Sequence, residues 1–90
     1  MPQDEAEALA LRALAWALGD EARARRLLDI TGLTPEVLRE GLDQPQVLAA
    51  TLEFLANHEP DLVAAAAALD VQPPTLIAAQ HALSQGHSLS

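Results

Sequence analysis

The chain has 90 residues, half of them hydrophobic, and it carries thirteen acidic side chains against five arginines, for a formal net charge of −8. So acidic a surface repels phosphate backbones and anionic lipids, and neither nucleic acids nor membranes are expected partners. The absence of cysteine excludes disulfides, thiol catalysis and thiolate metal sites.

The apolar residues are mostly alanine and leucine, and Trp16 and Phe54 are the only large aromatic residues. This composition favours helices over strands. The acidic N-terminus differs from a secretory signal, and no apolar run is long enough to span a bilayer. We therefore expect a soluble, cytoplasmic, all-α domain over 1–84, followed by a flexible C-terminal tail at 85–90.

The first predicted helix covers 3–18 and ends at Gly19. Its large apolar side chains do not share one stripe, so we expect this helix to be covered on most sides and to lie at the centre of the fold. These side chains are Leu9, Leu11, Leu14, Trp16 and Leu18.

The second predicted helix starts after Asp20, whose carboxylate can accept hydrogen bonds from the first amides of the helix, and it stops at a left-handed Gly32. Its opposite, polar face carries Arg23 and Arg26, with Arg25 at the margin. Apolar residues at the spacing i, i+3, i+4, i+7 mark the inner face: Ala24, Leu27, Leu28 and Thr31.

The third and fourth predicted helices each have a proline in the first turn, Pro35 and Pro45. Thr34 and Pro35 start a short helix that ends near Glu40, after which Gly41 is expected in the left-handed conformation. Asp43 is expected to begin the fourth helix. The apolar stripe of that helix is Val47, Leu48, Thr51, Leu52 and Leu55, with Phe54 beside it.

The fifth predicted helix begins at Pro60 and contains an alanine run over 64–68, whose smooth surface allows close helix packing. Pro73 and Pro74 interrupt the helical pattern because neither donates a backbone hydrogen bond. The last helix is predicted from about Pro74 to Leu83.

The pattern as a whole predicts a compact globule of about six short helices. A shift of 38 residues aligns similar side chains: Leu14 with Leu52, Trp16 with Phe54, and Pro35 with Pro73. Two interpretations stay open: two three-helix units related by duplication, or a chance match between helices rich in alanine and leucine. Trp16 and Phe54 are the expected core anchors.

The arginines of the second predicted helix also have two interpretations. Asp29 lies within one turn of Arg25 and Arg26, so ordinary surface ion pairs are favoured. The alternative is that Arg23, Arg26 and Arg39 form a small positive site for an acidic segment of an unidentified partner protein.

The sequence contains few motifs typical of catalytic or metal-binding sites. His58, Glu59 and Asp61 could offer metal ligands, but near a helix start such groups more often cap and solvate. Serines occur only in the last seven residues, and no phosphate-binding or nucleophile motif is present. We therefore expect no catalytic residue, no metal and no cofactor, and hence no enzyme.

Segments 24–42 and 63–83 each have the pattern of helix, tight turn and helix that DNA readers use. The segment that would read the bases, 75–81, contains no arginine or lysine and cannot anchor phosphates. DNA binding is therefore an alternative and not the leading interpretation.

Two stretches resemble a known family: Trp-Ala-Leu-Gly-Asp-Glu at 16–21 and Leu-Leu-Asp-Ile-Thr-Gly-Leu-Thr-Pro-Glu-Val-Leu-Arg at 27–39. Over most of its length the chain resembles the bacterial family called domain of unknown function 3572. The resemblance implies a small helical fold, and it supplies no activity, cofactor, partner or functional residue to carry over.

Since caps and core account for most residues, we expect a non-catalytic helical protein–protein interaction module. A divergent helix-turn-helix regulator and an accessory subunit of an enzyme are the alternatives. The alanine-rich surface leaves a homodimer open as well.

Overall fold

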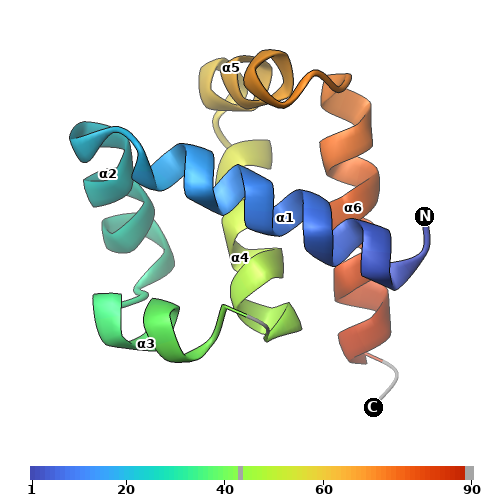
Figure 1. The fold of residues 1–90 in the computed structure, drawn as a ribbon, viewed down its shortest axis with the longest axis horizontal. Helices are drawn as coiled ribbons and strands as arrows, with labels where there is room; N and C mark the ends of the chain where they lie inside the picture. Colours follow the sequence, from blue (N-terminus) through green and yellow to red (C-terminus); the bar gives the residue numbers. More distant parts are fainter. Residues whose placement is uncertain (43, 89–90) are drawn as a thin grey trace.

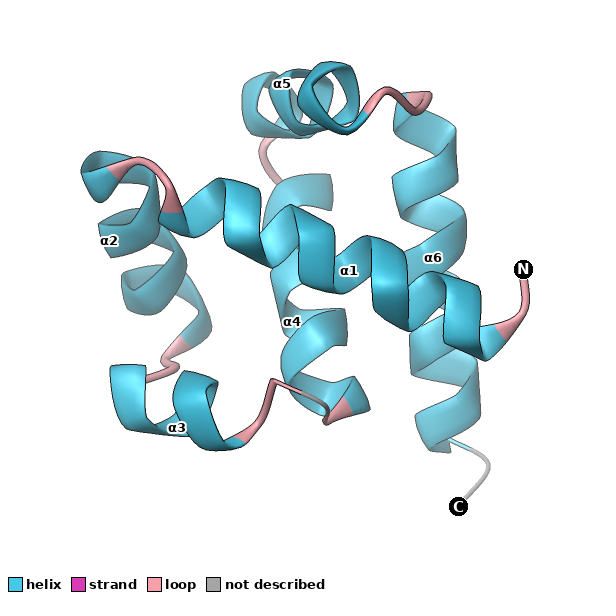
Figure 2. Cartoon of the chain, in the orientation of Figure 1, coloured by secondary structure: helices cyan, strands magenta, loops and turns pink. Residues whose placement is uncertain are grey.

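The computed structural model describes residues 1–42 and 44–88, which form six helices and no strand (Figure 1, Figure 2). The predicted all-α globule of about six short helices is therefore confirmed. The helices are α1 (Gln3–Leu18), α2 (Glu21–Thr31), α3 (Pro35–Glu40), α4 (Pro45–Ala56), α5 (Glu59–Leu69) and α6 (Pro73–Ser88).

Two capping side chains begin α2 and α3, as predicted. The Asp20 carboxylate accepts a hydrogen bond of 2.9 Å from the Arg23 amide, and the Thr34 hydroxyl accepts one of 3.1 Å from the Val37 amide. Each cap satisfies an amide that the helix itself leaves unpaired. Gly32 ends α2 with φ 75°, in the expected left-handed region.

Gly41 is required for a different reason from the expected one. Its φ is −111°, so the predicted left-handed conformation is wrong. A Cβ here would lie 2.9 Å from both the Val37 carbonyl oxygen, one turn back, and a methyl group of Val47 of α4, against which Gly41 lies. Asp43, the expected first residue of the fourth helix, lies outside the described residues, and α4 begins at Pro45.

The helix α1 crosses α4 and α6, which lie side by side, and it also contacts α2 and α5, so it is central as predicted (Figure 1). The prediction that it is covered on most sides is wrong. Leu11 is 43% and Leu18 is 41% exposed, because small side chains on another stripe let the neighbouring helices pack closely there. The buried stripe is Ala6, Leu9, Ala10, Ala13, Leu14 and Ala17.

The core consists mainly of leucines and alanines, most of them from α1, α4 and α6. The apolar stripe predicted for α4 is buried, and Phe54 lies in the core with only 3% of its surface exposed. Trp16, the other expected anchor, packs against the edge of this core and is only partly buried. Phe54 is therefore a core residue, whereas Trp16 lies at the edge of the core.

A sharp corner separates α5 from α6. Asp70 adopts φ 59°, which non-glycine residues rarely use, and the chain bends by 100° between α5 and the first part of α6. The helix α6 continues past its predicted end at Leu83 to Ser88, because extending a formed helix adds one backbone hydrogen bond per residue. Residues 85–88 of the expected tail are therefore helical, and residues 89–90 lie outside the described residues.

Within the described residues, no single helix is both long enough and apolar enough to cross a membrane. The helices α5 and α6 meet that length and composition only when they are taken together as a bent pair.

Several helix bounds recur at the shift of 38 residues found in the sequence. Shifted by 38, the bounds of α2, 21–31, fall on those of α5, 59–69, and the last residue of α1 falls on the last residue of α4. Gly32 and Asp70, which end α2 and α5 in the left-handed conformation, also correspond. The duplication itself stays a prediction.

The close approach at Gly41 predicts that Gly41→Ala lowers the free energy of unfolding by about 1–3 kcal/mol, because the added methyl group overlaps a backbone oxygen and a buried side chain. Urea unfolding followed by circular dichroism measures this change. The control is Gly19→Ala, at φ −74° with its nearest neighbour atom at 3.3 Å, which should change stability much less. Equal midpoints for Gly41→Ala and wild type would contradict the packing argument.

Candidate functional site

Trp16 and Arg23 form a stacked pair between α1 and α2. The guanidinium carbon of Arg23 lies 3.6 Å from the centre of the Trp16 ring, and its Nη2 donates a hydrogen bond of 2.8 Å to the Trp16 carbonyl oxygen. A cation over an indole ring contributes about 0.5–1 kcal/mol at an exposed site. Arg23 therefore helps to hold α2 against the end of α1.

Asp61, in the first turn of α5, is the one buried ionisable group of the described residues. Its Oδ2 accepts hydrogen bonds from Arg26 Nη2 at 2.5 Å and from His58 Nδ1 at 2.8 Å. Since Arg26 belongs to α2, this ion pair joins α2 to α5.

Burial alone would raise the pKa of the Asp61 carboxyl group. The hydrogen bonds from Arg26 and His58, together with their positive charge, outweigh burial and hold this pKa below its ordinary value of 3.8. Asp61 is therefore ionised at neutral pH and acts as a structural anion, with no general acid or base role implied.

The ion pairs differ from those expected on the surface of α2. Arg25 pairs with Glu21 at 3.5 Å instead of with Asp29. Arg12 of α1 donates a hydrogen bond of 3.1 Å to the Leu69 carbonyl oxygen at the end of α5. Cations stabilise the C-terminal end of a helix in this way.

The three arginines predicted as a partner-binding set are in different situations. Arg23 and Arg26 are engaged inside the molecule by Trp16 and Asp61. Arg39, on α3, is exposed and has neither an ion pair nor a side-chain hydrogen bond to any residue of 1–42 and 44–84. Binding of a partner by these three residues stays a prediction.

The combination of His58, Glu59 and Asp61 does not form a metal site. In the part of the chain that the structure describes, no group of three His, Cys, Asp or Glu side chains could hold a metal ion. Asp61 already binds Arg26 and His58, and Glu59 is exposed in the first turn of α5, where acidic side chains favour the helix dipole.

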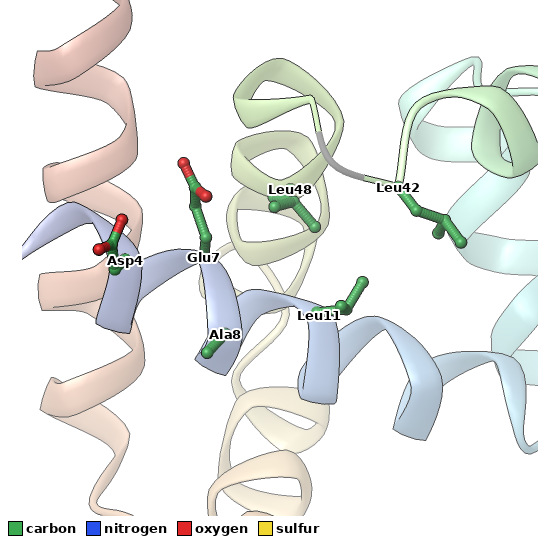
Figure 3. A pocket seen from close by; sticks show the side chains of 6 residues that line it. All are labelled: Asp4, Glu7, Ala8, Leu11, Leu42 and Leu48. Atoms are coloured by element: carbon green, nitrogen blue, oxygen red, sulfur yellow. The ribbon is translucent and has the colours of Figure 1, made fainter.

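An open, mostly apolar hollow of about 440 Å³ lies between α1, the start of α4 and the turn that precedes it (Figure 3). Leu11 of α1 points into it from one side, and Leu42 and Leu48 lie across from it, while Glu7 projects over one end (Figure 3). The lining residues are Asp4, Glu7, Ala8, Leu11, Leu42 and Leu48.

A second hollow of about 320 Å³ adjoins the first, because Leu42 lines both. Its lining is apolar except for the arginine of α3 and comprises Leu18, Leu28, Pro35, Leu38, Arg39 and Leu42. We call the two hollows together the Leu42 groove. Three of its leucines, Leu11, Leu18 and Leu42, are each more than 40% exposed.

The sequence interpretation missed this groove because it expected α1 to be covered on most sides. One feature of the sequence does indicate the buried face of α1. Ala6, Ala10, Ala13 and Ala17 recur at the helical spacing of a buried face, and if they mark that face then Leu11 must lie off it. Leu42 had no such signal, since its position depends on the turn between α3 and α4.

The comparisons with known proteins identify a family and nothing more specific. A family model described as "Protein of unknown function (DUF3572)" matches residues 3–86. No curated protein and no solved structure matches the chain.

The stacking of Arg23 on Trp16 predicts that Arg23→Ala shifts tryptophan emission to longer wavelength and increases quenching by acrylamide, because the ring loses its cover. Trp16 is the only tryptophan, so the signal is unambiguous. Arg25→Ala is the matched control, since Arg25 is exposed and contacts Glu21 instead. Equal quenching of the two variants would show that Arg23 does not cover the ring.

The buried ion pair predicts that Asp61→Asn lowers the free energy of unfolding by about 1–2 kcal/mol, a value reduced because Arg26 is half exposed. Denaturant unfolding measures the loss. Glu21→Gln, which breaks the exposed pair with Arg25, should change stability little. An Asp61→Asn variant as stable as wild type would mean that the pair contributes nothing.

The Asp61 carboxylate also makes the stability of the fold depend on pH. Because the pKa of Asp61 is lower in the folded than in the unfolded chain, its stabilisation is fully present above about pH 4 and is lost as the pH falls through the folded-state value. The difference in stability between wild type and Asp61→Asn should therefore shrink below about pH 4. A difference that grows on acidification would have the wrong sign.

Proposed function

We propose that this chain, which belongs to the DUF3572 family of proteins of unknown function, is a non-catalytic module that binds a partner protein in the Leu42 groove. The observation that carries the proposal is the gathering of Leu11, Leu18 and Leu42, each more than 40% exposed, along one groove. Contiguous exposed apolar surface of this kind is typical of interaction sites.

The openness of the groove favours a protein over a small molecule. Small-molecule sites enclose most of the ligand surface, whereas both hollows of the Leu42 groove open broadly to solvent. Apolar side chains projecting from another protein could fill them and bury the exposed leucines. Such anchors, seated in pockets, supply most of the energy of typical interfaces.

A catalytic role has less support. Of the three side chains that the sequence analysis considered as metal ligands, Asp61 and His58 are paired with each other, and Asp61 also binds Arg26. An accessory subunit of an enzyme would still use a docking surface and is compatible with the proposal. Cytoplasmic residence stays a prediction from the sequence.

One observation favours a second candidate, a helix-turn-helix regulator. The bend of 100° between α5 and α6 falls in the range that this motif uses. The charge argues against it, because the chain has no arginine or lysine after Arg39 and α6 therefore offers no cation to a phosphate. We therefore rank it below the interaction module.

The proposal predicts that the double variant Leu11→Asp/Leu42→Asp loses its partner. The tagged chain is used to capture proteins from a lysate of the source organism, and a retained protein is then identified and purified. Its affinity should fall at least about tenfold in the double variant, because two charges replace apolar anchors. Isothermal titration calorimetry measures the affinity, and circular dichroism verifies that the variant is folded.

The matched control is Ile30→Asp/Val63→Asp, which places the same charges at two exposed apolar residues outside the groove. This variant should bind like wild type. Equal losses in both variants, or unchanged binding of the groove variant, would exclude the Leu42 groove as the docking site.

A further inference from the structure

We infer that the occupant of the Leu42 groove is an amphipathic helix of a partner protein, with basic side chains at one end of its apolar stripe and an acidic side chain at the other. The inference rests on the proposed function, since it names the chemistry of the partner that docks at the same site. Two observations support this inference: the length of the groove, and the different charges that line its two hollows.

The length of the groove follows from α1. Asp4, Leu11 and Leu18 are spaced seven residues apart, so they lie nearly in line along one side of the helix. At about 1.5 Å per residue, this row is roughly 21 Å long. A row of that length matches four turns of a partner helix, whose anchors recur at i, i+3 or i+4, and i+7.

The two hollows of the groove differ in charge. Asp4 and Glu7 line the first hollow, and no cation lines it among the described residues (Figure 3). Among the residues that the structure describes, Arg39 is the only charged one that lines the second hollow. The other described side chains that line the two hollows are apolar, so a partner with a plain apolar stripe would leave these charges unmatched.

The other four arginines do not contribute positive charge to the groove. Arg12, Arg23, Arg25 and Arg26 each bind a group elsewhere in the molecule. A carboxylate of the partner that approaches Arg39 would gain a charge-assisted hydrogen bond at the rim of an apolar surface. The partner residues that approach Asp4 and Glu7 must be lysine or arginine for the same reason.

A second copy of the chain fits this groove less well. Two copies each carry a net charge of −8 and therefore repel each other. In addition, if two copies met groove to groove, the hollows of one copy would face the hollows of the other and neither would be filled. A single helix that projects from a partner fills both hollows of the groove. The self-association that the sequence leaves open is therefore an outcome for the test to detect.

The experiment uses a phage-displayed library of helix-forming peptides of about 18 residues, selected on the full chain. Selected peptides should carry an apolar stripe with Lys or Arg at one end and Asp or Glu at the other. Their affinity, measured by fluorescence anisotropy with the synthetic peptide, should be lost in Leu11→Asp/Leu42→Asp and kept in Ile30→Asp/Val63→Asp.

A charge exchange then tests the ends directly. Asp4→Lys/Glu7→Lys should weaken binding of a selected peptide about tenfold at low salt, and replacing the basic residues of the peptide by Glu should restore it. Arg39→Glu should behave likewise toward the acidic end of the peptide. Restored affinity cannot be explained by a change in folding.

The outcomes separate the two claims. In one outcome, the selected peptides bind only when Leu11 and Leu42 are intact and yet show no charge preference, or the charge exchange does not restore their affinity. Either result overturns the inference and leaves the proposed function standing. If every selected peptide binds Leu11→Asp/Leu42→Asp as well as wild type, or if light scattering shows a dimer that this variant dissolves, both claims fail.

Discussion

Four alanines on α1 set the geometry on which the rest of the molecule depends. Ala6, Ala10, Ala13 and Ala17 are fully buried and form most of the face that α1 turns toward the core. Because their side chains are short, helices can approach this face closely and larger leucines fill the space around it. The face that packs inward also determines which leucines of α1 remain outside, and so it creates the Leu42 groove.

Much of the fold could be predicted because the local signals and the tertiary structure agree. Asp20, Thr34, Gly32 and the helix-starting prolines act at the positions that their chemistry favours, and the stripe of α4 is buried as its spacing indicates. The groove could not be predicted in the same way. Sequence reasoning treats large apolar residues as inside, whereas here small ones occupy the inner face and Leu11 and Leu18 do not.

Long-range pairing was also beyond sequence reasoning. Asp29 is the obvious partner of Arg26 within one turn, yet Arg26 binds Asp61, which is 35 residues away. Only the packing of α2 near α5 brings these charges together. The same holds for Gly41, whose small size matters because Val47 lies against it, and not because of its own backbone conformation. In each case the deciding neighbour is distant in sequence or on another helix.

The coincidence of helix bounds at a shift of 38 residues has a consequence for valency. Under that shift, Leu11, Leu18 and Leu42 correspond to Ala49, Ala56 and Gln80. Several helix bounds therefore recur at this shift, but the residues that form the Leu42 groove do not. If the groove binds a partner as proposed, the chain has one such site and not two, so one copy of it would bind one copy of the partner without cross-linking two of them.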